Sequence, residues 1–323
     1  MKRIAASLTV AICAALIVAP ATGQDITRPN TTRQDTEVLA TGTDGHDRLT
    51  VPVKLGDSGP FRFMIDTGSQ NTVVSDVLVK RLALVPRSKA TLIGIAGVMQ
   101  ADLVEIDEIG LGSHFSYGIL APILQRTDIG ADGILGLDSL QDQRVLIDFR
   151  RQTMQVGDAR ALGGNRGFEI VVTARRRSGQ LILTNAMIDG VQADVVIDTG
   201  SDTTLGNRAL QRELGRRGRS ATQTQLLSVT GQQVSADIGQ ADTLEIHGVT
   251  FRGITIAFVD SPTFAHLGLD RRPAIFLGMR EMRLFSRIAI DFKSRKVLFD
   301  LPPSDAARSF GMNFDRTGSR TAP

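Results

Sequence analysis

The sequence predicts an all-β protein of two pseudo-symmetric β-barrel lobes with a central cleft and few short helices. Two observations support this prediction. The stretch FMIDTGSQNTVVS at 63–75 has a counterpart in VVIDTGSDTTLGN at 195–207. The 323-residue chain also contains 32 glycines, which suit many short strands and tight turns. A chain of this length can build two domains with separate cores.

The N-terminus reads as a signal peptide at 1–23. Lys2 and Arg3 precede a nearly continuous apolar run at 4–18, and small residues follow before Gln24. We therefore expect export to a periplasm or secretion, with an uncleaved signal anchor as the alternative. Cys13 is the only cysteine and would leave with the signal peptide. The mature chain would then lack disulfides, cysteine nucleophiles and thiolate metal sites.

Charge and histidine content point away from several classes of function. Removing Lys2 and Arg3 takes the formal net charge from +3 to +1. The arginine runs at 175–177 and 212–219 lack interleaved aromatic residues, so we expect solvated surface and no nucleic-acid partner. The four histidines are scattered, and the sequence contains no phosphate-binding loop. We therefore expect no metal and no cofactor.

The repeat extends well beyond the two Asp-Thr-Gly-Ser segments. A short alternating strand ending in glycine precedes each copy, and Ser75 and Asn207 each offer a cap residue before a helical pattern. Glycine-centred turns follow within 94–106 and 228–246. Then 132–140 pairs with 274–282, and 144–149 pairs with 287–292. Alternating apolar runs make each copy mostly β. We place the lobes at 36–160 and 166–302, with flexible segments at 24–35 and 303–323.

The paired aspartates, Asp66 and Asp198, suggest acid–base chemistry. In a duplicated protein, a residue beside the pseudo-twofold axis meets its own counterpart across that axis. Two carboxyl groups placed this closely share one proton, so the pair offers a general base and a general acid at the same time. Aspartic proteases are the standard example of such a dyad.

The residues after each aspartate suit this role. The glycines allow close backbone approach, the threonines can hydrogen-bond across the lobe interface, and the serines can donate to the outer carboxylate oxygens. These supporting residues are Thr67, Gly68, Ser69, Thr199, Gly200 and Ser201. The alternative is a pair of Asx-turns at two hairpins.

The sequence resembles the aspartic peptidases. The segments IDTGSQNTVVS and IDTGSDTTLGN and the apolar-apolar-Gly elements at 134–136 and 276–278 carry the resemblance. The compact lobes are most similar to bacterial retropepsin-like aspartyl proteases, here with two lobes in one chain, over most of 45–300. The resemblance implies a pepsin-like bilobed fold and a support role for Leu135, Gly136, Leu277 and Gly278.

The resemblance also implies peptide-bond hydrolysis by a water molecule activated between Asp66 and Asp198, with a protein or peptide as substrate. Hairpin flaps would close over that substrate, and an ordinary surface hairpin is the alternative for each. Unlike pepsin flaps, neither candidate contains tyrosine, and Ile95 and Val98 favour apolar substrate side chains. The flap candidates are Gly94, Ile95, Ala96, Gly97, Val98, Thr230 and Gly231.

Other motifs in the sequence fit structural roles better than catalytic ones. The GDSGP segment at 56–60 resembles a serine-protease motif but lies where a hairpin turn belongs. Asp148 and Asp291 also repeat, at strand ends where a structural role fits best.

We expect activity as a monomer and a mildly acid pH optimum. Two alternatives stay open: a peptide- or protein-binding module that has lost efficient turnover, and a protease kept latent by residues 24–45.

Overall fold

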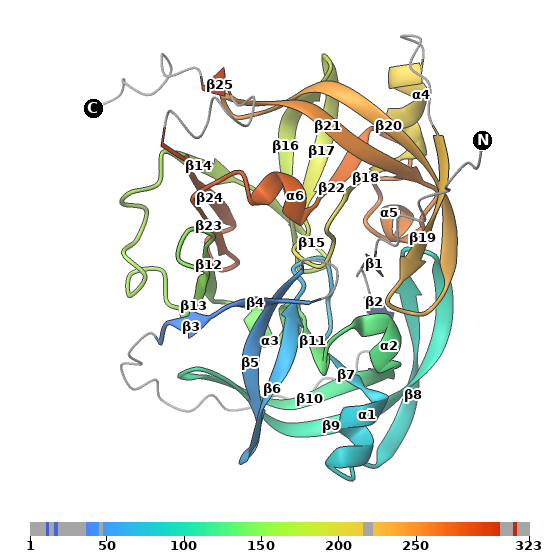
Figure 1. The fold of residues 1–323 in the computed structure, drawn as a ribbon, viewed down its shortest axis with the longest axis vertical. Helices are drawn as coiled ribbons and strands as arrows, with labels where there is room; N and C mark the ends of the chain where they lie inside the picture. Colours follow the sequence, from blue (N-terminus) through green and yellow to red (C-terminus); the bar gives the residue numbers. More distant parts are fainter. Residues whose placement is uncertain are drawn as a thin grey trace, which may run out of the picture.

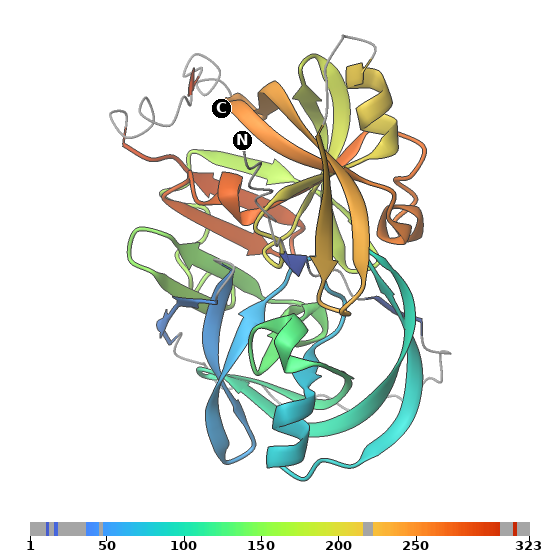
Figure 2. The ribbon, with the colours of Figure 1, turned by 45° about the vertical axis from the view of Figure 1, so that its right-hand side comes forward.

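The computed structural model confirms the all-β, two-lobed architecture. It describes residues 11–12, 16–18, 37–44, 48–215, 222–303 and 313–314. Figures 1 and 2 show the N-terminal lobe in blue to green and the C-terminal lobe in yellow to orange, one above the other. The predicted signal peptide at 1–23 and the predicted flexible segments at 24–35 and 303–323 lie almost wholly outside the described residues.

The N-terminal lobe is built on a nine-stranded sheet in the order β2-β8-β9-β10-β7-β11-β6-β5-β4. The GDSGP segment supplies the turn between β5 and β6 at Gly56 and Asp57, as predicted, and its last three residues begin β6. The end of β6 is buried continuously because Phe63 and Ile65 pack into one apolar cluster and Met64, on the opposite face, packs into another. The strands are β2 (Leu16–Val18), β4 (Gly42–Thr43), β5 (Leu49–Leu55), β6 (Ser58–Ile65), β7 (Val73–Ser75), β8 (Pro86–Gly94), β9 (Gly97–Leu111), β10 (His114–Leu124) and β11 (Gly133–Leu135).

The C-terminal lobe repeats this plan in a ten-stranded sheet. Its order is β1-β19-β20-β16-β17-β22-β18-β21-β25, with β15 paired to β16. The strands β16, β17, β18 and β22 correspond to β5, β6, β7 and β11 of the first lobe. The strands are β1 (Ala11–Ile12), β15 (Arg175–Arg177), β16 (Gln180–Ile188), β17 (Val191–Ile197), β18 (Thr204–Asn207), β19 (Thr222–Ser228), β20 (Gln233–Ile246), β21 (Val249–Val259), β22 (Ala274–Leu277) and β25 (Asn313–Phe314).

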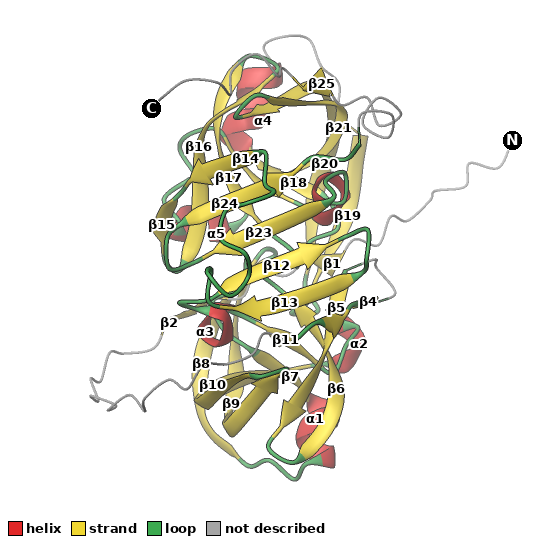
Figure 3. Ribbon diagram, turned by 90° about the vertical axis from the view of Figure 1, so that its left-hand side faces the viewer, coloured by secondary structure: helices red, strands yellow, loops and turns green. Residues whose placement is uncertain are grey.

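A six-stranded sheet joins the two lobes in the order β14-β24-β23-β12-β13-β3 (Figure 3). Its centre is the antiparallel pair β12 and β23, formed by the repeated segments RVLID and RIAID. Arg144 on β12 donates to Asp291 on β23 at 2.9 Å, and both side chains are 2% exposed. The strands are β3 (Leu39–Ala40), β12 (Arg144–Asp148), β13 (Thr153–Gly157), β14 (Ile170–Thr173), β23 (Arg287–Asp291) and β24 (Lys296–Asp300).

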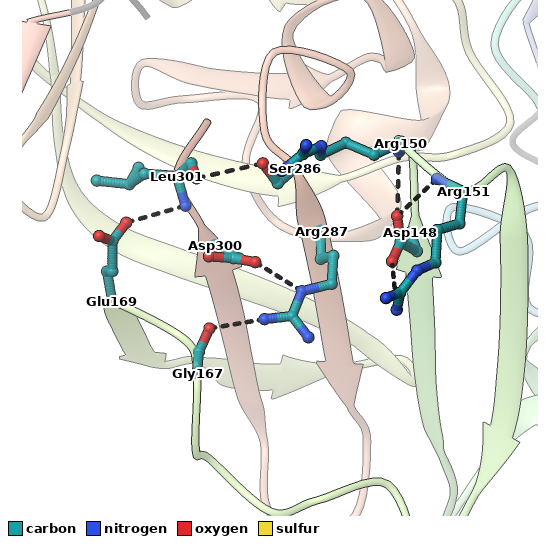
Figure 4. Close-up of polar contacts among 9 residues, drawn as sticks. All are labelled: Asp148, Arg150, Arg151, Gly167, Glu169, Ser286, Arg287, Asp300 and Leu301. Carbon is teal, nitrogen blue, oxygen red and sulfur yellow. Dashed lines mark hydrogen bonds and ion pairs between the residues drawn. The ribbon is translucent and has the colours of Figure 1, made fainter. Parts of the chain in front are cut away.

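The ends of this sheet are fixed by charged side chains (Figure 4). Asp148 accepts from the main-chain N–H groups of Arg150 and Arg151 at 3.1 and 2.8 Å. Arg287 donates to Asp300 at 2.6 Å and to the Gly167 carbonyl at 2.8 Å. A cavity of 510 Å³ lies among these side chains, and none of its lining residues belongs to an Asp-Thr-Gly loop. Asp148 and Asp291 therefore make the structural contacts that their strand-end positions suggest.

The helices described are short and connect the strands. Ser75 caps the first helix by accepting from the Leu78 N–H at 3.1 Å, and Asn207 accepts from the Leu210 N–H at 2.8 Å. Both helix starts were predicted, although the first helix ends at Arg81, before the predicted apolar pattern ends. The helices are α1 (Asp76–Arg81), α2 (Arg126–Ile129), α3 (Leu137–Leu140), α4 (Arg208–Gly215), α5 (Pro262–His266) and α6 (Met279–Met282). No helix in the described ranges is long and apolar enough to cross a membrane.

Candidate active site

Asp66 and Asp198 occupy equivalent positions directly after β6 and β17. Behind each lies a parallel strand, β11 in the first lobe and β22 in the second. The Asp66 N–H donates to the Leu135 carbonyl, and the Asp198 N–H donates to the Leu277 carbonyl, each at 3.1 Å. The main chain of each apolar-apolar-Gly element therefore holds the backbone at the aspartate.

Gly136 and Gly278 allow each supporting strand to cross close to the loop that follows the aspartate. A Cβ atom at Gly136 would lie 2.3 Å from the Asn71 carbonyl carbon. The equivalent atom at Gly278 would lie 2.6 Å from the Thr203 carbonyl carbon. These separations exclude any larger residue without movement of the backbone.

The two threonines bind each loop to the opposite lobe. The Thr67 N–H donates to Thr199 Oγ1 at 3.0 Å, and the Thr199 N–H donates to Thr67 Oγ1 at 3.2 Å. Each hydroxyl then donates to a carbonyl across the interface, at Ile197 and Ile65 respectively. The four bonds are related by the pseudo-twofold axis, so they fix the two aspartates relative to one another.

The two carboxyl groups face one another across the same axis. Each lies against the glycine of the opposite lobe: a Cβ atom at Gly68 would be 2.8 Å from Asp198 Oδ1, and one at Gly200 would be 2.3 Å from Asp66 Cγ. Both aspartates are fully buried. The glycines thus leave the only space in which two opposed carboxyl groups can approach.

The inner and outer oxygens of the pair differ in their partners. Asp66 Oδ1 accepts from the N–H groups of Gly68 and Ser69 at 2.8 and 2.9 Å, and Asp198 Oδ1 accepts from Gly200 at 2.9 Å. The outer oxygens, Asp66 Oδ2 and Asp198 Oδ2, are buried and have no hydrogen-bond partner among the described residues. Buried polar atoms are rarely left unpaired, so these acceptors require a donor, either the proton shared by the two carboxyl groups or a polar ligand.

Both aspartates bind a proton more tightly than ordinary carboxyl groups. Burial raises the pKa of Asp66 well above its usual range, and the neighbouring Asp198 raises it further. Burial also raises the pKa of Asp198 to about 7. The loop N–H groups lower the pKa of both groups, a hydrogen bond with Asp66 lowers the pKa of Asp198, and the positive charge of Arg48 lowers both pKa values to a smaller extent. The pair therefore keeps a shared proton where isolated aspartates are ionised.

The two serine hydroxyls differ from the sequence-based expectation. Ser69 Oγ donates to the Asn71 carbonyl at 2.8 Å, and Ser201 Oγ donates to the Thr203 carbonyl at 2.6 Å. They stabilise the turn of each loop and leave the outer carboxylate oxygens unpaired. Serine hydroxyls commonly donate to main-chain carbonyls of their own turn, and both hydroxyls do so here.

Sequence analysis missed a carboxylate beneath each loop, Asp138, which is partly buried, and Glu281, which is buried. Thr72 Oγ1 donates to Asp138 at 2.6 Å and accepts from the Gly136 N–H at 3.1 Å. Thr204 Oγ1 donates to Glu281 at 2.5 Å and accepts from the Gly278 N–H at 3.0 Å. The repeated threonine, at the same distance after each aspartate, is the signal that could have identified this arrangement.

The two hairpins named as flap candidates extend from each lobe toward the other (Figure 2). The tip of β8–β9 buries Ile95, which is 1% exposed, among apolar side chains of the C-terminal lobe such as Leu226 and Phe264. The tip of β19–β20 buries Val229 among apolar side chains of the N-terminal lobe such as Leu92. Each tip therefore packs into the opposite lobe.

This packing changes the sequence-based view of the hairpin side chains. Ile95 and Val98 were expected to give the cleft an apolar lining. Ile95 instead fills a space in the opposite lobe, and Val98 is 53% exposed. Gly94 and Gly97 lie against side chains of the other hairpin, at Thr230 and Gln232.

Two short strands pair with these hairpins. Ala11 and Ile12 run parallel to Leu227 and Ser228 on β19. The main chain at Leu16–Val18 runs antiparallel to β8 at 91–93. The edges of both hairpins therefore accept an extended main chain.

Comparisons with known proteins agree with this geometry. A family described as Aspartyl protease matches the chain at 51–139 and 184–280, which is more than half of its length. The two matched regions each contain one Asp-Thr-Gly loop and its supporting apolar-Gly element. No curated protein matches the chain. Among the described residues, no group of three or more histidine, cysteine, aspartate or glutamate side chains is arranged to hold a metal ion.

Proposed function

Because this chain belongs to a family of aspartyl proteases, we propose that it is an endopeptidase that hydrolyses peptide bonds with a water molecule held between Asp66 and Asp198. The observation that carries the proposal is the pair of buried, unpartnered outer oxygens on two opposed carboxyl groups. Water offers two donors and so suits two such acceptors. The raised pKa of both groups supports a dyad with one shared proton.

In the proposed mechanism, the ionised carboxylate takes a proton from this water as it attacks the carbonyl carbon of the substrate. The protonated carboxyl group gives its proton to the carbonyl oxygen, which forms a tetrahedral diol. As the diol collapses and the C–N bond breaks, the protonated carboxyl group gives its proton to the leaving amine, and the ionised carboxylate takes a proton from one of the diol hydroxyl groups. The dyad ends with one proton, as it began, and no covalent intermediate is formed.

We propose that the hairpins β8–β9 and β19–β20 act as flaps. Their main-chain pairing with residues 11–12 and 16–18 supports binding of a substrate as an added strand. The burial of Ile95 and Val229 in opposite lobes supports a closed state in which both tips exclude water. Substrate entry would require both tips to leave these positions.

We further propose that the mature chain acts as an exported monomer. Support for the monomer comes from both halves of the dyad lying in one chain, since no second copy is needed to build the site. Support for export comes from the basic and apolar pattern at 2–23. Light scattering in parallel with activity tests the monomer, and active dimers with inactive monomers would contradict it.

The first test combines residues 24–323 with a diverse peptide library between pH 3 and pH 8. Mass spectrometry identifies new peptide termini, and the variants Asp66→Asn and Asp198→Asn are assayed in parallel. We expect cleavage that is lost in both variants and is fastest toward the neutral end of the mildly acid range, because burial raises the pKa of both aspartates. A pH optimum above 8, or cleavage that survives in either variant, would contradict the dyad mechanism.

A Gln70→Glu variant in the first loop would be unsuitable as a control, because the Gln70 side-chain amide donates to the Ser178 carbonyl. Gly215→Ala is a better matched control, because a Cβ atom there would meet no atom of the described residues within 4 Å. If the intact protein binds peptides without cleaving them, and Asp66→Asn binds them equally well, the protein is a binding module. If cleavage begins only after residues 24–45 are removed, that segment keeps the protease latent.

A further inference from the structure

Two fully buried polar residues lie across the sheet from the dyad. The β5–β6 ladder ends at the pair Thr50 and Met64, and its register, continued by two residues, brings Arg48 opposite Asp66. The β16–β17 ladder ends at the pair Ile182 and Val196, and its register, continued by two residues, brings Gln180 opposite Asp198. Side chains of directly opposed residues lie on the same face of a sheet and close together. Arg48 and Gln180 are thus equivalent neighbours of the two aspartates.

Arg48 is held by contacts within its own lobe. Its Nε donates to Asp44 Oδ2 at 2.7 Å, and its main-chain N–H donates to Asp44 Oδ1 at 2.9 Å. A second guanidinium nitrogen donates to the Ile129 carbonyl. The side chain is 0% exposed. A buried arginine so constrained keeps its positive charge in a fixed position.

Gln180 makes a different contact from the equivalent position. Its Nε2 donates to the Gly68 carbonyl, in the loop of the other aspartate. The N–H of that same Gly68 donates to Asp66 Oδ1, so the amide holds the loop that orients Asp66. Gln180 Oε1 is buried and has no partner among the described residues. Gln180 therefore acts across the lobe interface, and it carries no charge.

We propose that Arg48 is a positioning residue that biases the dyad toward its singly ionised state by its charge, whereas Gln180 supports the dyad through its hydrogen bond to Gly68. This inference rests on the proposed peptidase function. A water molecule can be activated only when one of the two carboxyl groups is ionised. The two loops are therefore symmetric in structure, but the electric field around them is not, because Arg48 is charged and Gln180 is neutral.

The electrostatics of the site agree with this role. Burial is the largest influence on Asp66 and Asp198 and raises the pKa of both, whereas Arg48 lowers the pKa of both by less than the loop N–H groups do. The other charged groups packed nearby are carboxylates: Asp44, which is paired with Arg48, and the two beneath the loops, Asp138 and Glu281. Arg48 is therefore the cation that opposes the effect of burial on the dyad.

The test changes charge and shape separately. The double variant Asp44→Asn with Arg48→Gln removes the ion pair and keeps similar volumes. Arg48→Lys retains the charge and loses the planar guanidinium. Gln180→Met removes the equivalent amide without a change of charge. The readouts are the pH dependence of kcat/KM for a library-derived peptide and the titration of ¹³Cγ-labelled aspartates by NMR, which requires no turnover.

We expect the double variant to shift the dyad titration and both limbs of the kcat/KM profile upward, because carboxyl groups ionise less readily without the nearby cation, although the loss of the Asp44 charge offsets part of this shift. Arg48→Lys should titrate as the unmodified protein does. Gln180→Met should lower kcat/KM with the limbs unmoved. Unchanged titration in the double variant, or an equal shift in Arg48→Lys, would overturn the role of charge.

A further variant covers the case in which the double variant does not fold. Asp44→Asn alone keeps Arg48 and removes its counter-charge, so the dyad titration should shift downward in pH; an upward shift or none would overturn the inference. The two proposals also fail separately. Absence of hydrolysis by the intact protein, together with the expected NMR shifts, would refute the peptidase function and leave the effect of Arg48 on the dyad established.

Discussion

The two lobes are nearly identical within the Asp-Thr-Gly loops and differ in the residues around them. Both loops have the same main-chain bond to an apolar-Gly strand, the same reciprocal threonine contacts and the same bond from a buried threonine to a carboxylate. Opposite the aspartates, however, one lobe has a charged arginine and the other a neutral glutamine. The two lobes are thus symmetric in the loops that bring the carboxyl groups together. They differ at the positions opposite the aspartates, where a charge can change how readily the carboxyl groups ionise.

The largest expected effect concerns the glycines that face the opposite carboxyl group. Gly200→Ala would bring a methyl group to 2.3 Å from Asp66 Cγ, whereas Gly68→Ala would bring one to 2.8 Å from Asp198 Oδ1. Displacing a reacting group by about 1 Å can cost about 10²-fold in rate. We expect kcat/KM to fall by at least that factor in both variants, and further in Gly200→Ala. Gly215→Ala is the control, and equal activity of all three proteins would contradict the close approach.

A smaller effect is expected from the threonines that join the lobes. Thr67→Val leaves the buried Thr199 N–H without its acceptor, and Thr199→Val does the same to the Thr67 N–H. We expect each to lower the free energy of unfolding by about 2 kcal/mol, measured by urea denaturation. The free energy of unfolding should fall less in the double variant than the sum of its falls in the two single variants, because all four bonds form one network. Fully additive losses would show that the contacts act independently.

The smallest effect compares the carboxylates beneath the loops. Asp138 accepts from both the main-chain N–H and the hydroxyl of Thr72, whereas Glu281 accepts from the hydroxyl of Thr204. An amide in place of Asp138 cannot accept all of these bonds through one oxygen. We therefore expect Asp138→Asn to cost about 1 kcal/mol and Glu281→Gln to cost less. A larger loss in Glu281→Gln would reverse this comparison of the lobes.

The two carboxylates also predict a dependence of stability on pH. Burial raises the pKa of Glu281 to about 6 from a usual value of 4.5. A carboxyl group with a raised pKa favours the folded state below its unfolded pKa, and this contribution is lost as the pH rises through the folded pKa. Thermal unfolding between pH 4 and pH 7 should therefore show a smaller decline in Glu281→Gln than in the unmodified protein. An identical decline would assign the pH dependence to other groups.

Much of the fold could be predicted because its signals are local. Alternating apolar runs indicated the strands, the GDSGP turn was placed correctly, and Ser75 and Asn207 marked the starts of α1 and α4. Local patterns were less successful where two acceptors compete. Ser69 lies close to both a carboxylate and a carbonyl of its own turn, and the order of residues does not decide between them.

Other features depend on contacts between distant segments. The burial of Ile95 in the C-terminal lobe and of Val229 in the N-terminal lobe follows from how the lobes dock. Ile95 is one apolar residue in a glycine-rich turn, a pattern equally compatible with an exposed hairpin tip. The carboxylates of Asp138 and Glu281 were missed for a similar reason, because their partners, Thr72 and Thr204, lie on distant segments.

The sequence by itself determined that this protein has two equivalent lobes, each with an aspartate at the same point of a repeated unit. The sequence is enough to show this because the same Asp-Thr-Gly-Ser segment occurs at the same point of both repeated units. The tertiary structure alone decided that Arg48 and Gln180 lie opposite those aspartates and that each hairpin tip packs into the other lobe. These outcomes depend on strand register and on the docking of two surfaces. Both are set by the sum of many long-range contacts, which no single segment of the sequence specifies.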